Sequence, residues 1–285
     1  MAIRSVFTGV AKYPYYEQVD VSTVWFGGFA LSQKRKCELG LHMNFNAAYP
    51  DIKVLEISSA SLQSLGAKLS AVKLSKFTQK GVTSLESAFQ CSRIYSDGVR
   101  RVGPFPEYLF LPGKKCKKIV KEASLGMHSY EYLFDGMTFY APEFHISLFY
   151  DYLYLNALLE PENQAVREEL LSSSFLAFTD LATLALNSQA RSAAIFRGLV
   201  MAGLIDEVRD YHAYHRLFLA STDGKATGPE SYKNVPLLDK GRLKSLLPAV
   251  PCTVGKADIE AYYKEHCYML TNRKEEDNYL DLKGK

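Results

Sequence analysis

Several features that mark other protein classes are missing from this sequence of 285 residues. The five cysteines are widely scattered and form no C-x-x-C pair, which argues against a zinc site and against a disulfide framework. No apolar run approaches the roughly 20 residues that cross a bilayer. The first residues also lack the apolar core of a signal peptide. We therefore expect a cytoplasmic protein that has no membrane partner.

A large excess of one charge and the standard catalytic signatures are missing too. The net charge is only +3, which is too small for a dedicated nucleic-acid coat but leaves room for local basic patches. The sequence contains no G-x-S-x-G, Walker A, G-x-G-x-x-G, H-E-x-x-H or EF-hand motif. His212 and His215 have the spacing of metal ligands but no nearby third ligand, so we expect neither a metal nor a cofactor.

The most informative stretch that is present spans residues 83–95, which we predict to be a helix with Ser84 as its N-cap. At 100° per residue, Glu86, Gln90 and Arg93 fall within a sector of roughly 60° beside an apolar face. A carboxylate, an amide and a guanidinium would therefore lie at the edge of a core. Such a stripe suits recognition of a polar ligand or stabilisation of a developing positive charge.

The remaining pattern predicts long helices around one hairpin, a mainly α fold with a minor β component (α+β). The hairpin is the clearest local signal, because Asp135-Gly136 stands between two alternating apolar stretches. Strands are expected at residues 19–26, 53–58, 108–111 and 175–181. Helices are expected at residues 29–43, within 61–74, from 114, and at 143–159, 161–172, 190–204, 211–220 and 256–270.

Aromatic residues are plentiful, with 19 Tyr and 16 Phe, and they suit either a ligand pocket or ordinary core packing. One aromatic cluster surrounds a pair of glycines: Trp25, Phe26, Gly27, Gly28 and Phe29. Glycines beside aromatic rings permit close approach of the backbone to a ligand. A turn that merely redirects the chain explains these residues equally well.

The most basic run of the chain is made of five lysines: Lys114, Lys115, Lys117, Lys118 and Lys121. A solvated helix face is the more usual explanation for such a run. The other interpretation is a patch that contacts phosphates, which would make binding salt-dependent.

Carboxylates supply the remaining chemistry. Glu86, Asp151 and Asp180 each stand within an apolar, ordered segment. Cleavage of a glycosidic bond needs such groups, to stabilise an oxocarbenium-like transition state and to activate water. Each of them is equally compatible with a role as a helix cap or an ion-pair partner. Gln189 and Arg191 stand in the first turn of a helix, where free backbone N–H groups favour anions.

Residues 83–90, followed by Arg93, resemble the S-E-H-Y-F-Q-A-x-K helix of the NADAR family, with the Glu and Gln at the same spacing. Residues 25–30 are similar to that family's aromatic segment ending in S-N-F. Segments 149–154, 178–180 and 189–194 look closest to the NADAR antitoxins encoded beside DarT-type toxins. The resemblance covers roughly residues 25–204. It implies a multihelical catalytic domain at 1–205, followed by a helical extension at 206–285.

The implied activity is hydrolysis of N-glycosidic bonds, and in the antitoxin subgroup removal of ADP-ribose from guanine in DNA. By this resemblance Glu86 is the catalytic glutamate, with Asp180 or Asp151 as the second carboxylate. Gln90 and Arg93 would bind ribose hydroxyls or pyrophosphate. The aromatic rings of residues 25–29 would stack on a base. The sequence departs from the family pattern around Glu86, because Leu85 precedes it and Ser87-Ala88 replaces His-Tyr.

Three functions remain open. The protein is expected to act on ADP-ribosylated DNA as the antitoxin of a DNA ADP-ribosyltransferase toxin. The first alternative is an N-glycosidase for a small ribosylamino-pyrimidine metabolite. The second is a non-catalytic protein that binds ADP-ribose or the toxin itself.

Overall fold

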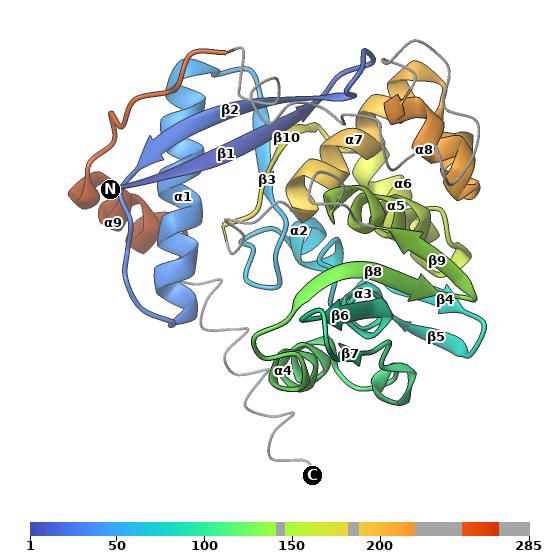
Figure 1. Ribbon diagram of the computed structural model, residues 1–285. Helices are drawn as coiled ribbons and strands as arrows, with labels where there is room; N and C mark the ends of the chain where they lie inside the picture. Colours follow the sequence, from blue (N-terminus) through green and yellow to red (C-terminus); the bar gives the residue numbers. More distant parts are fainter. Residues whose placement is uncertain (141–145, 182–187, 220–246, 268–285) are drawn as a thin grey trace.

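The protein is described by a computed structural model that covers residues 1–140, 146–181, 188–219 and 247–267 (Figure 1). Its described residues form two four-stranded sheets, a short hairpin and several helices, so the predicted α+β class is confirmed. One sheet lies in the upper half of Figure 1 and the other in the lower half. None of the helices in the described ranges combines the length and the apolar character that spanning a membrane requires.

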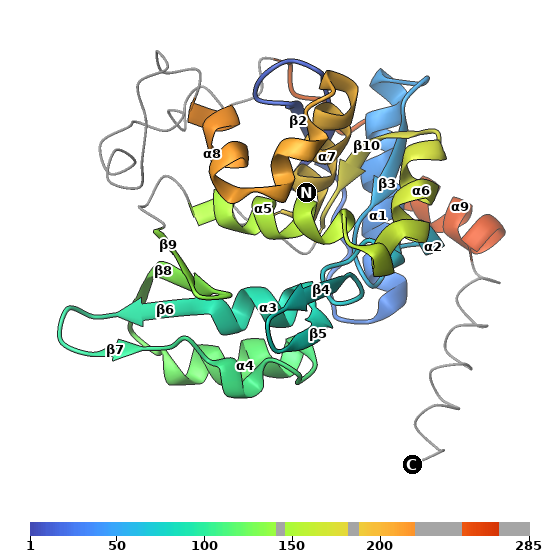
Figure 2. The ribbon, with the colours of Figure 1, turned by 90° about the vertical axis from the view of Figure 1, so that its right-hand side faces the viewer.

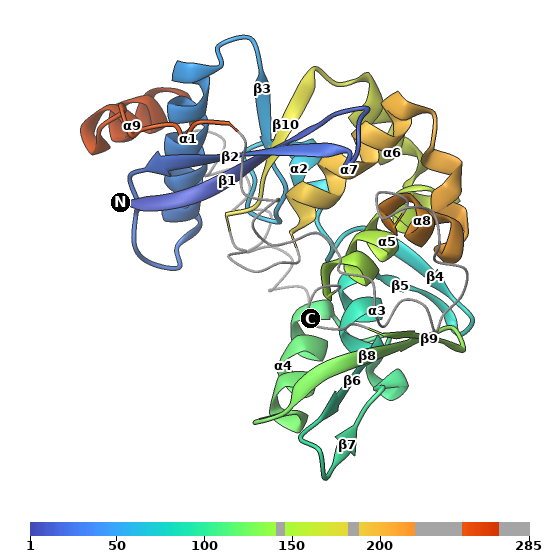
Figure 3. The same cartoon turned by 45° about the horizontal axis from the view of Figure 1, so that its top comes forward.

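The upper sheet joins strands that are far apart in sequence. Its strands, in spatial order, are β2 (Tyr16–Thr23), β1 (Ala2–Gly9), β10 (Phe175–Thr179) and β3 (Lys53–Glu56). Strand β1 runs antiparallel to both neighbours, whereas β10 and β3 are parallel. Figure 3 shows α1 (Leu31–Ala48) and α7 (Gln189–Ala202) packed against this sheet.

Both faces of the upper sheet are buried, and the alternation of side chains along each strand explains why. Val6 and Val54 pack with Leu41 of α1 in one apolar cluster. Their neighbours Phe7 and Leu55 point to the opposite face and join the larger cluster that contains α7. The carboxyl ends of the parallel strands β3 and β10 therefore meet between two helical layers.

The lower sheet is antiparallel throughout. Its strands, in spatial order, are β7 (Arg101–Val102), β6 (Arg93–Ser96), β8 (His128–Phe134) and β9 (Met137–Tyr140). Strands β8 and β9 form the predicted hairpin, and Asp135 and Gly136 have φ values of 49° and 80°. Positive φ at both central residues is what a type I′ turn requires, so the Asp-Gly prediction is confirmed in detail.

Helix α5 (Ile146–Leu158) joins the two halves. It packs against α7 on one side and against α3 (Leu85–Ser92) on the other. Figure 2 shows α3 between α5 and α4 (Gly113–Ala123), and the hairpin of β4 (Ser75–Thr78) and β5 (Gly81–Ser84) leads into α3. The side chains of α5 are apolar on nearly every face because helices or strands surround it.

The remaining elements are short and cover the periphery. They are α2 (Ser64–Lys68), η1 (Pro106–Tyr108), η2 (Pro161–Asn163), α6 (Gln164–Ser172), η3 (Ile205–Arg209), α8 (Tyr211–Leu219), α9 (Lys256–Tyr262) and η5 (Tyr263–Cys267). Helix α8 packs on α5, and α9 packs on α1. The described parts of the expected extension 206–285 thus rest on the same body, and the boundary at residue 205 stays a prediction.

Several predicted boundaries are wrong. The helix over residues 83–95 ends at Ser92, because Arg93–Ser96 pairs with β8 as strand β6. No strand forms at residues 108–111, because Tyr108 is the last residue of the short helix η1 and the three residues after it form turns or bends. The strand expected at 19–26 spans Tyr16–Thr23 instead. The ends of the helices predicted at 143–159, 211–220 and 256–270 lie partly outside the described residues.

Candidate active site

The N-terminus of α3 is held by several hydrogen bonds. The Ser84 hydroxyl accepts from the Ser87 N–H at 3.1 Å, which confirms the predicted N-cap. The Ser87 hydroxyl donates to the Leu111 carbonyl at 2.8 Å, and the Glu86 N–H donates to the Ala71 carbonyl at 2.9 Å. Glu86 therefore stands in the first turn of a helix that is anchored to two neighbouring loops.

The side chain of Glu86 is oriented by Gln90 one turn later. Gln90 is only 4% exposed, and its Nε2 donates to Glu86 Oε1 at 3.0 Å. The start of α4 closes over the other side of Glu86. A Cβ added to Gly113 would lie 2.6 Å from Glu86 Cγ, so only glycine fits there. The predicted pairing of Glu86 and Gln90 on one helix face is thus seen in the structure.

Arg93 does not belong to this helix stripe. Its backbone begins strand β6, and its guanidinium lies over the rings of Phe89, at 5.6 Å, and Tyr95, at 4.8 Å. Its buried Nε has no hydrogen-bond partner among the described residues. The position of Arg93 on the helix was wrong because strand pairing with β8 ends α3 one turn early.

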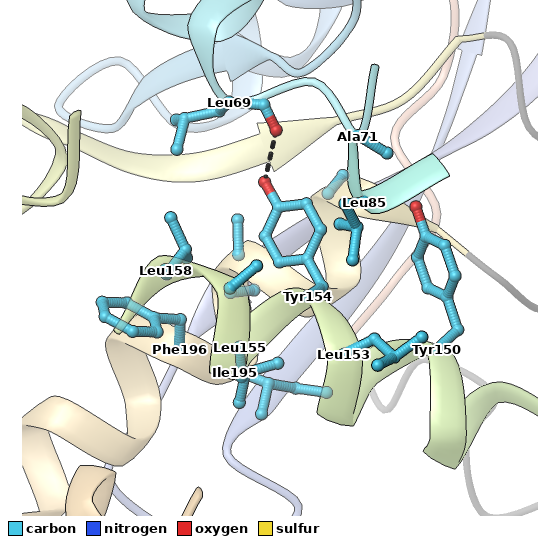
Figure 4. Close-up of a cluster of buried hydrophobic side chains, with 14 of the residues drawn as sticks. Leu69, Ala71, Leu85, Tyr150, Leu153, Tyr154, Leu155, Leu158, Ile195 and Phe196 are labelled. Carbon is cyan, nitrogen blue, oxygen red and sulfur yellow. Dashed lines mark hydrogen bonds between the residues drawn. The ribbon is translucent and has the colours of Figure 1, made fainter. Parts of the chain in front are cut away.

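The pKa of a buried phenol, Tyr150 of α5, is influenced by all three predicted carboxylates. Burial raises the pKa of Tyr150 well above its ordinary value, and Glu86, Asp180 and Asp151 raise it further by electrostatic repulsion of the phenolate. Figure 4 shows the Tyr150 and Tyr154 hydroxyls on the side of α5 that faces Leu69 and Ala71. The Tyr154 hydroxyl donates to the Leu69 carbonyl at 2.8 Å. We call Glu86, Gln90, Tyr150, Asp180 and Gln189 the carboxylate site.

Asp180 enters this site from the end of strand β10, and it is 6% exposed. Its Oδ2 accepts from the Gln189 N–H at 3.1 Å and from Gln189 Nε2 at 3.4 Å. Gln189 Oε1 in turn accepts from the Ala71 N–H at 2.6 Å. Gln189 therefore links Asp180 to Ala71, and the Ala71 carbonyl accepts a hydrogen bond from the Glu86 N–H. Asp180 and Glu86, which are far apart in sequence, are thus connected through one amide side chain and the backbone of Ala71.

Asp151, unlike Glu86 and Asp180, is bound by a guanidinium and a hydroxyl. Its Oδ2 accepts from Arg191 Nη2 at 3.0 Å, and its Oδ1 accepts from the Ser192 hydroxyl at 2.6 Å. Burial raises the pKa of Asp151, and Arg191 opposes that rise. Burial lowers the pKa of Arg191, but the charge and hydrogen bond of Asp151, together with the influence of Tyr16 and Tyr214, make the net shift upward. This buried pair fastens α5 to α7, and such an arrangement is typical of an anchor.

The aromatic segment lines a separate pocket of about 320 Å³ at the edge of the upper sheet. Trp25, Phe26, Gly28 and Phe29 line this pocket, together with Arg4. The Arg4 guanidinium lies 4.2 Å from the Trp25 ring centre. Trp25 is 40% exposed and Phe29 is 95% exposed, whereas Phe26 is buried. We call this the aromatic pocket; Gly27 adjoins it in sequence but is not among its lining residues.

The aromatic pocket also contains two acids that the sequence analysis did not single out, Glu38 and Glu56. Glu38 accepts from the Leu62 N–H at 2.9 Å, and burial raises its pKa to about 8. Glu56 accepts from the Thr179 hydroxyl at 2.7 Å and from the Leu181 N–H at 3.1 Å. Burial also raises the pKa of Glu56 well above its ordinary value, with Glu38 and Asp180 adding to the rise. The only signal in the sequence is that each acid interrupts an apolar stretch.

The carboxylate site and the aromatic pocket meet at the end of β10. Asp180 belongs to the first, and the next residue, Leu181, lines the second while its N–H binds Glu56. Among the described residues there is no group of three or more His, Cys, Asp or Glu side chains arranged to hold a metal ion. The candidate site therefore consists of carboxylates, amides, a phenol and aromatic rings.

Comparison with known protein families finds a family model that matches most of this chain. The family model described as DarT1-associated NADAR antitoxin matches residues 2–227. This match spans both sheets, the helices between them and every residue of the carboxylate site. A search of the curated proteins finds no match. The chain belongs to the DarT1-associated NADAR antitoxin family.

Proposed function

We propose that this antitoxin is an N-glycosidase that removes ADP-ribose from guanine in DNA and so reverses the modification made by a DNA ADP-ribosyltransferase toxin. The observation that carries the proposal is the hydrogen-bonded path from Asp180 through Gln189 to Ala71, whose carbonyl accepts from the Glu86 N–H. Each of the two carboxylates is also oriented by an amide side chain. Two oriented carboxylates are what hydrolysis of a glycosidic bond needs. The membership in an antitoxin family supplies the biological setting.

In this mechanism the bond between ribose C1′ and the guanine nitrogen breaks, and its electron pair leaves with the base. Positive charge develops on the ribose, and the Glu86 carboxylate stabilises it. Asp180 accepts a proton from the attacking water, whose oxygen bonds to C1′. The departing guanine nitrogen takes up a proton from solvent, and Asp180 then returns its proton to solvent. Gln90 holds Glu86 at a fixed angle, so its negative charge needs no reorientation as the barrier is crossed.

Tyr150 contributes a neutral hydroxyl to this scheme. Because its pKa is raised well above the ordinary value, the phenol stays protonated at neutral pH. It is therefore a hydrogen-bond donor among carboxylates, suited to a ribose oxygen or to a carboxylate oxygen. Asp151 keeps α5 and α7 aligned through its pair with Arg191, and we assign it a positioning role rather than contact with the reacting atoms.

The aromatic pocket suits a nucleobase. Trp25 and Phe29 expose ring surface on which a base can stack, and the lining Gly28 has a φ of +109° and no side chain to obstruct it. Since the pocket adjoins Asp180 through Leu181, a ligand whose ribose lies at the carboxylate site can extend into it. Phe26, which is buried, also lines this pocket, and Gly27 precedes the lining Gly28 in sequence.

The test offers the purified protein two substrates and also measures its binding to the first. Release of ADP-ribose from an oligonucleotide that carries ADP-ribosyl guanine, without turnover of a ribosylamino-pyrimidine, supports the proposal. Turnover of the small metabolite alone would reassign the protein to that class. Tight binding of ADP-ribosylated DNA with no release of ADP-ribose would make it a non-catalytic binder.

A further inference from the structure

Helix α4 carries the lysine run on its exposed side. The five lysines, Lys114, Lys115, Lys117, Lys118 and Lys121, are all exposed, while Cys116 and Val120 pack into an apolar cluster with residues of α3 and β6. At 100° per residue, Lys114, Lys117 and Lys121 lie within about 60° of one another. Within the described residues, only Lys118 of the five forms an ion pair, with Glu122 at 3.9 Å. We call all five of these lysines the lysine face.

The lysine face begins beside the carboxylate site. Helix α4 starts at Gly113, whose missing side chain gives room for Glu86. The Ser87 hydroxyl ties α3 to the Leu111 carbonyl just before α4, which fixes the two helix starts together. Figure 2 shows α3 and α4 side by side along much of their length. A strand whose modified base reaches Glu86 would therefore have its backbone close to these lysines.

The spacing of the charges suits a nucleic-acid backbone. Lys114 and Lys121 are seven residues apart, which is about 10 Å along a helix that rises 1.5 Å per residue. One DNA strand carries a phosphate about every 3.4 Å along the duplex axis, so the face spans about three phosphates. Lysines three and four residues apart repel one another, and a polyanion removes that repulsion. The net charge of the whole chain is only +3, so this concentration is local.

We propose that the lysine face of α4 binds the phosphate backbone of the DNA strand that carries the modified guanine. This inference rests on the proposed function, because it names the surface that holds the same substrate. An acidic surface on a protein partner is the competing occupant. The described chain favours DNA because three of the lysines are aligned along the helix axis and their row starts at the candidate catalytic carboxylate.

The test uses a triple variant, K114Q/K117Q/K121Q, against a charge-matched control, K12Q/K53Q/K264Q, whose lysines are exposed and lie outside α4. Binding of an unmodified single-stranded oligonucleotide is measured by fluorescence anisotropy over a series of salt concentrations. We expect the α4 variant to bind about tenfold more weakly, and its slope of log affinity against log salt to decrease in magnitude by about 2, given about 0.7 per phosphate contact. The control variant should match the wild type.

A second readout separates this inference from the proposed function. Release of ADP-ribose is measured from a modified oligonucleotide and from a modified guanosine mononucleotide. We expect the α4 variant to lose about tenfold in kcat/KM on the oligonucleotide and nothing on the mononucleotide. Equal oligonucleotide binding by the α4 variant and the control overturns the inference, as does loss of toxin binding with DNA binding intact. If the wild type releases ADP-ribose from neither substrate, the proposed function fails, and the anisotropy result still decides whether α4 binds DNA.

Discussion

At the scale of single residues, the three predicted carboxyl groups differ in the partners that bind them. Glu86 and Asp180 are oriented by amides, Gln90 and Gln189, and keep the ability to interact with a ligand. Asp151 instead accepts from a buried guanidinium and a hydroxyl. Hydrogen-bond partners, rather than residue type, therefore distinguish the two carboxylates that we propose to react from the one that we propose to be an anchor.

This division predicts the outcome of Asp151→Ala. Removing one member of a buried ion pair leaves Arg191 charged and unpaired, which costs about 3–5 kcal/mol of unfolding free energy. Urea unfolding measures the loss, and Glu162→Ala on an exposed turn serves as the control, with a change of about 0.5 kcal/mol or less. A D151A protein that keeps wild-type stability and loses all turnover would show that Asp151 is catalytic.

Glu38 predicts a pH dependence of stability. Its pKa is about 8 in the folded protein and 4.5 when unperturbed, so the folded state holds a proton that the unfolded chain gives up. Its stabilising contribution is therefore complete below pH 4.5 and is lost as the pH rises to about 8. Glu38→Gln preserves the hydrogen bond from Leu62 and should flatten this decline, measured by urea unfolding at a series of pH values. An identical decline in wild type and variant would show that Glu38 is not its cause.

At the scale of elements, the helix cap and the hairpin turn were predicted correctly, whereas the end of helix α3 was not. Ser84 as a cap and Asp135-Gly136 as a turn depend on neighbouring residues alone, so the sequence sufficed to predict them. The end of α3 depends on the pairing of Arg93–Ser96 with β8, about 35 residues away along the chain. Helical periodicity contains no information about such a partner, and Arg93 was therefore placed on the wrong element.

The contact between α3 and α4 gives a third prediction. Gly113→Ala places a methyl group against Glu86, and such overpacking costs about 1–3 kcal/mol unless Glu86 moves. We expect G113A to lower kcat by tenfold or more, because Glu86 is pushed from the angle that Gln90 maintains. Kinetics and urea unfolding on the same protein separate the two effects. Wild-type kcat together with wild-type stability in G113A would contradict the close packing of these helices.

At the scale of the whole molecule, the order of strands in the upper sheet decides which of the candidate residues lie close together. Strand β10 lies between β1 and β3, which brings Asp180 beside Glu56 and within the surroundings of Tyr150. The order of strands in a sheet does not follow from the pattern of any one strand. Hence Glu86, Asp180 and Gln189 were predicted as site residues, whereas Glu38 and Glu56 were missed.

The central claim is that Glu86 is the group that stabilises the charge developing on ribose. Its most direct test is single-turnover release of ADP-ribose from an oligonucleotide with ADP-ribosyl guanine, comparing wild type, Glu86→Gln and the exposed control Glu162→Gln. We predict that E86Q loses about 10²–10⁴-fold in rate while it still binds the substrate, and that E162Q is unchanged. A rate for E86Q within twofold of the wild type, with about equal binding, would contradict the claim.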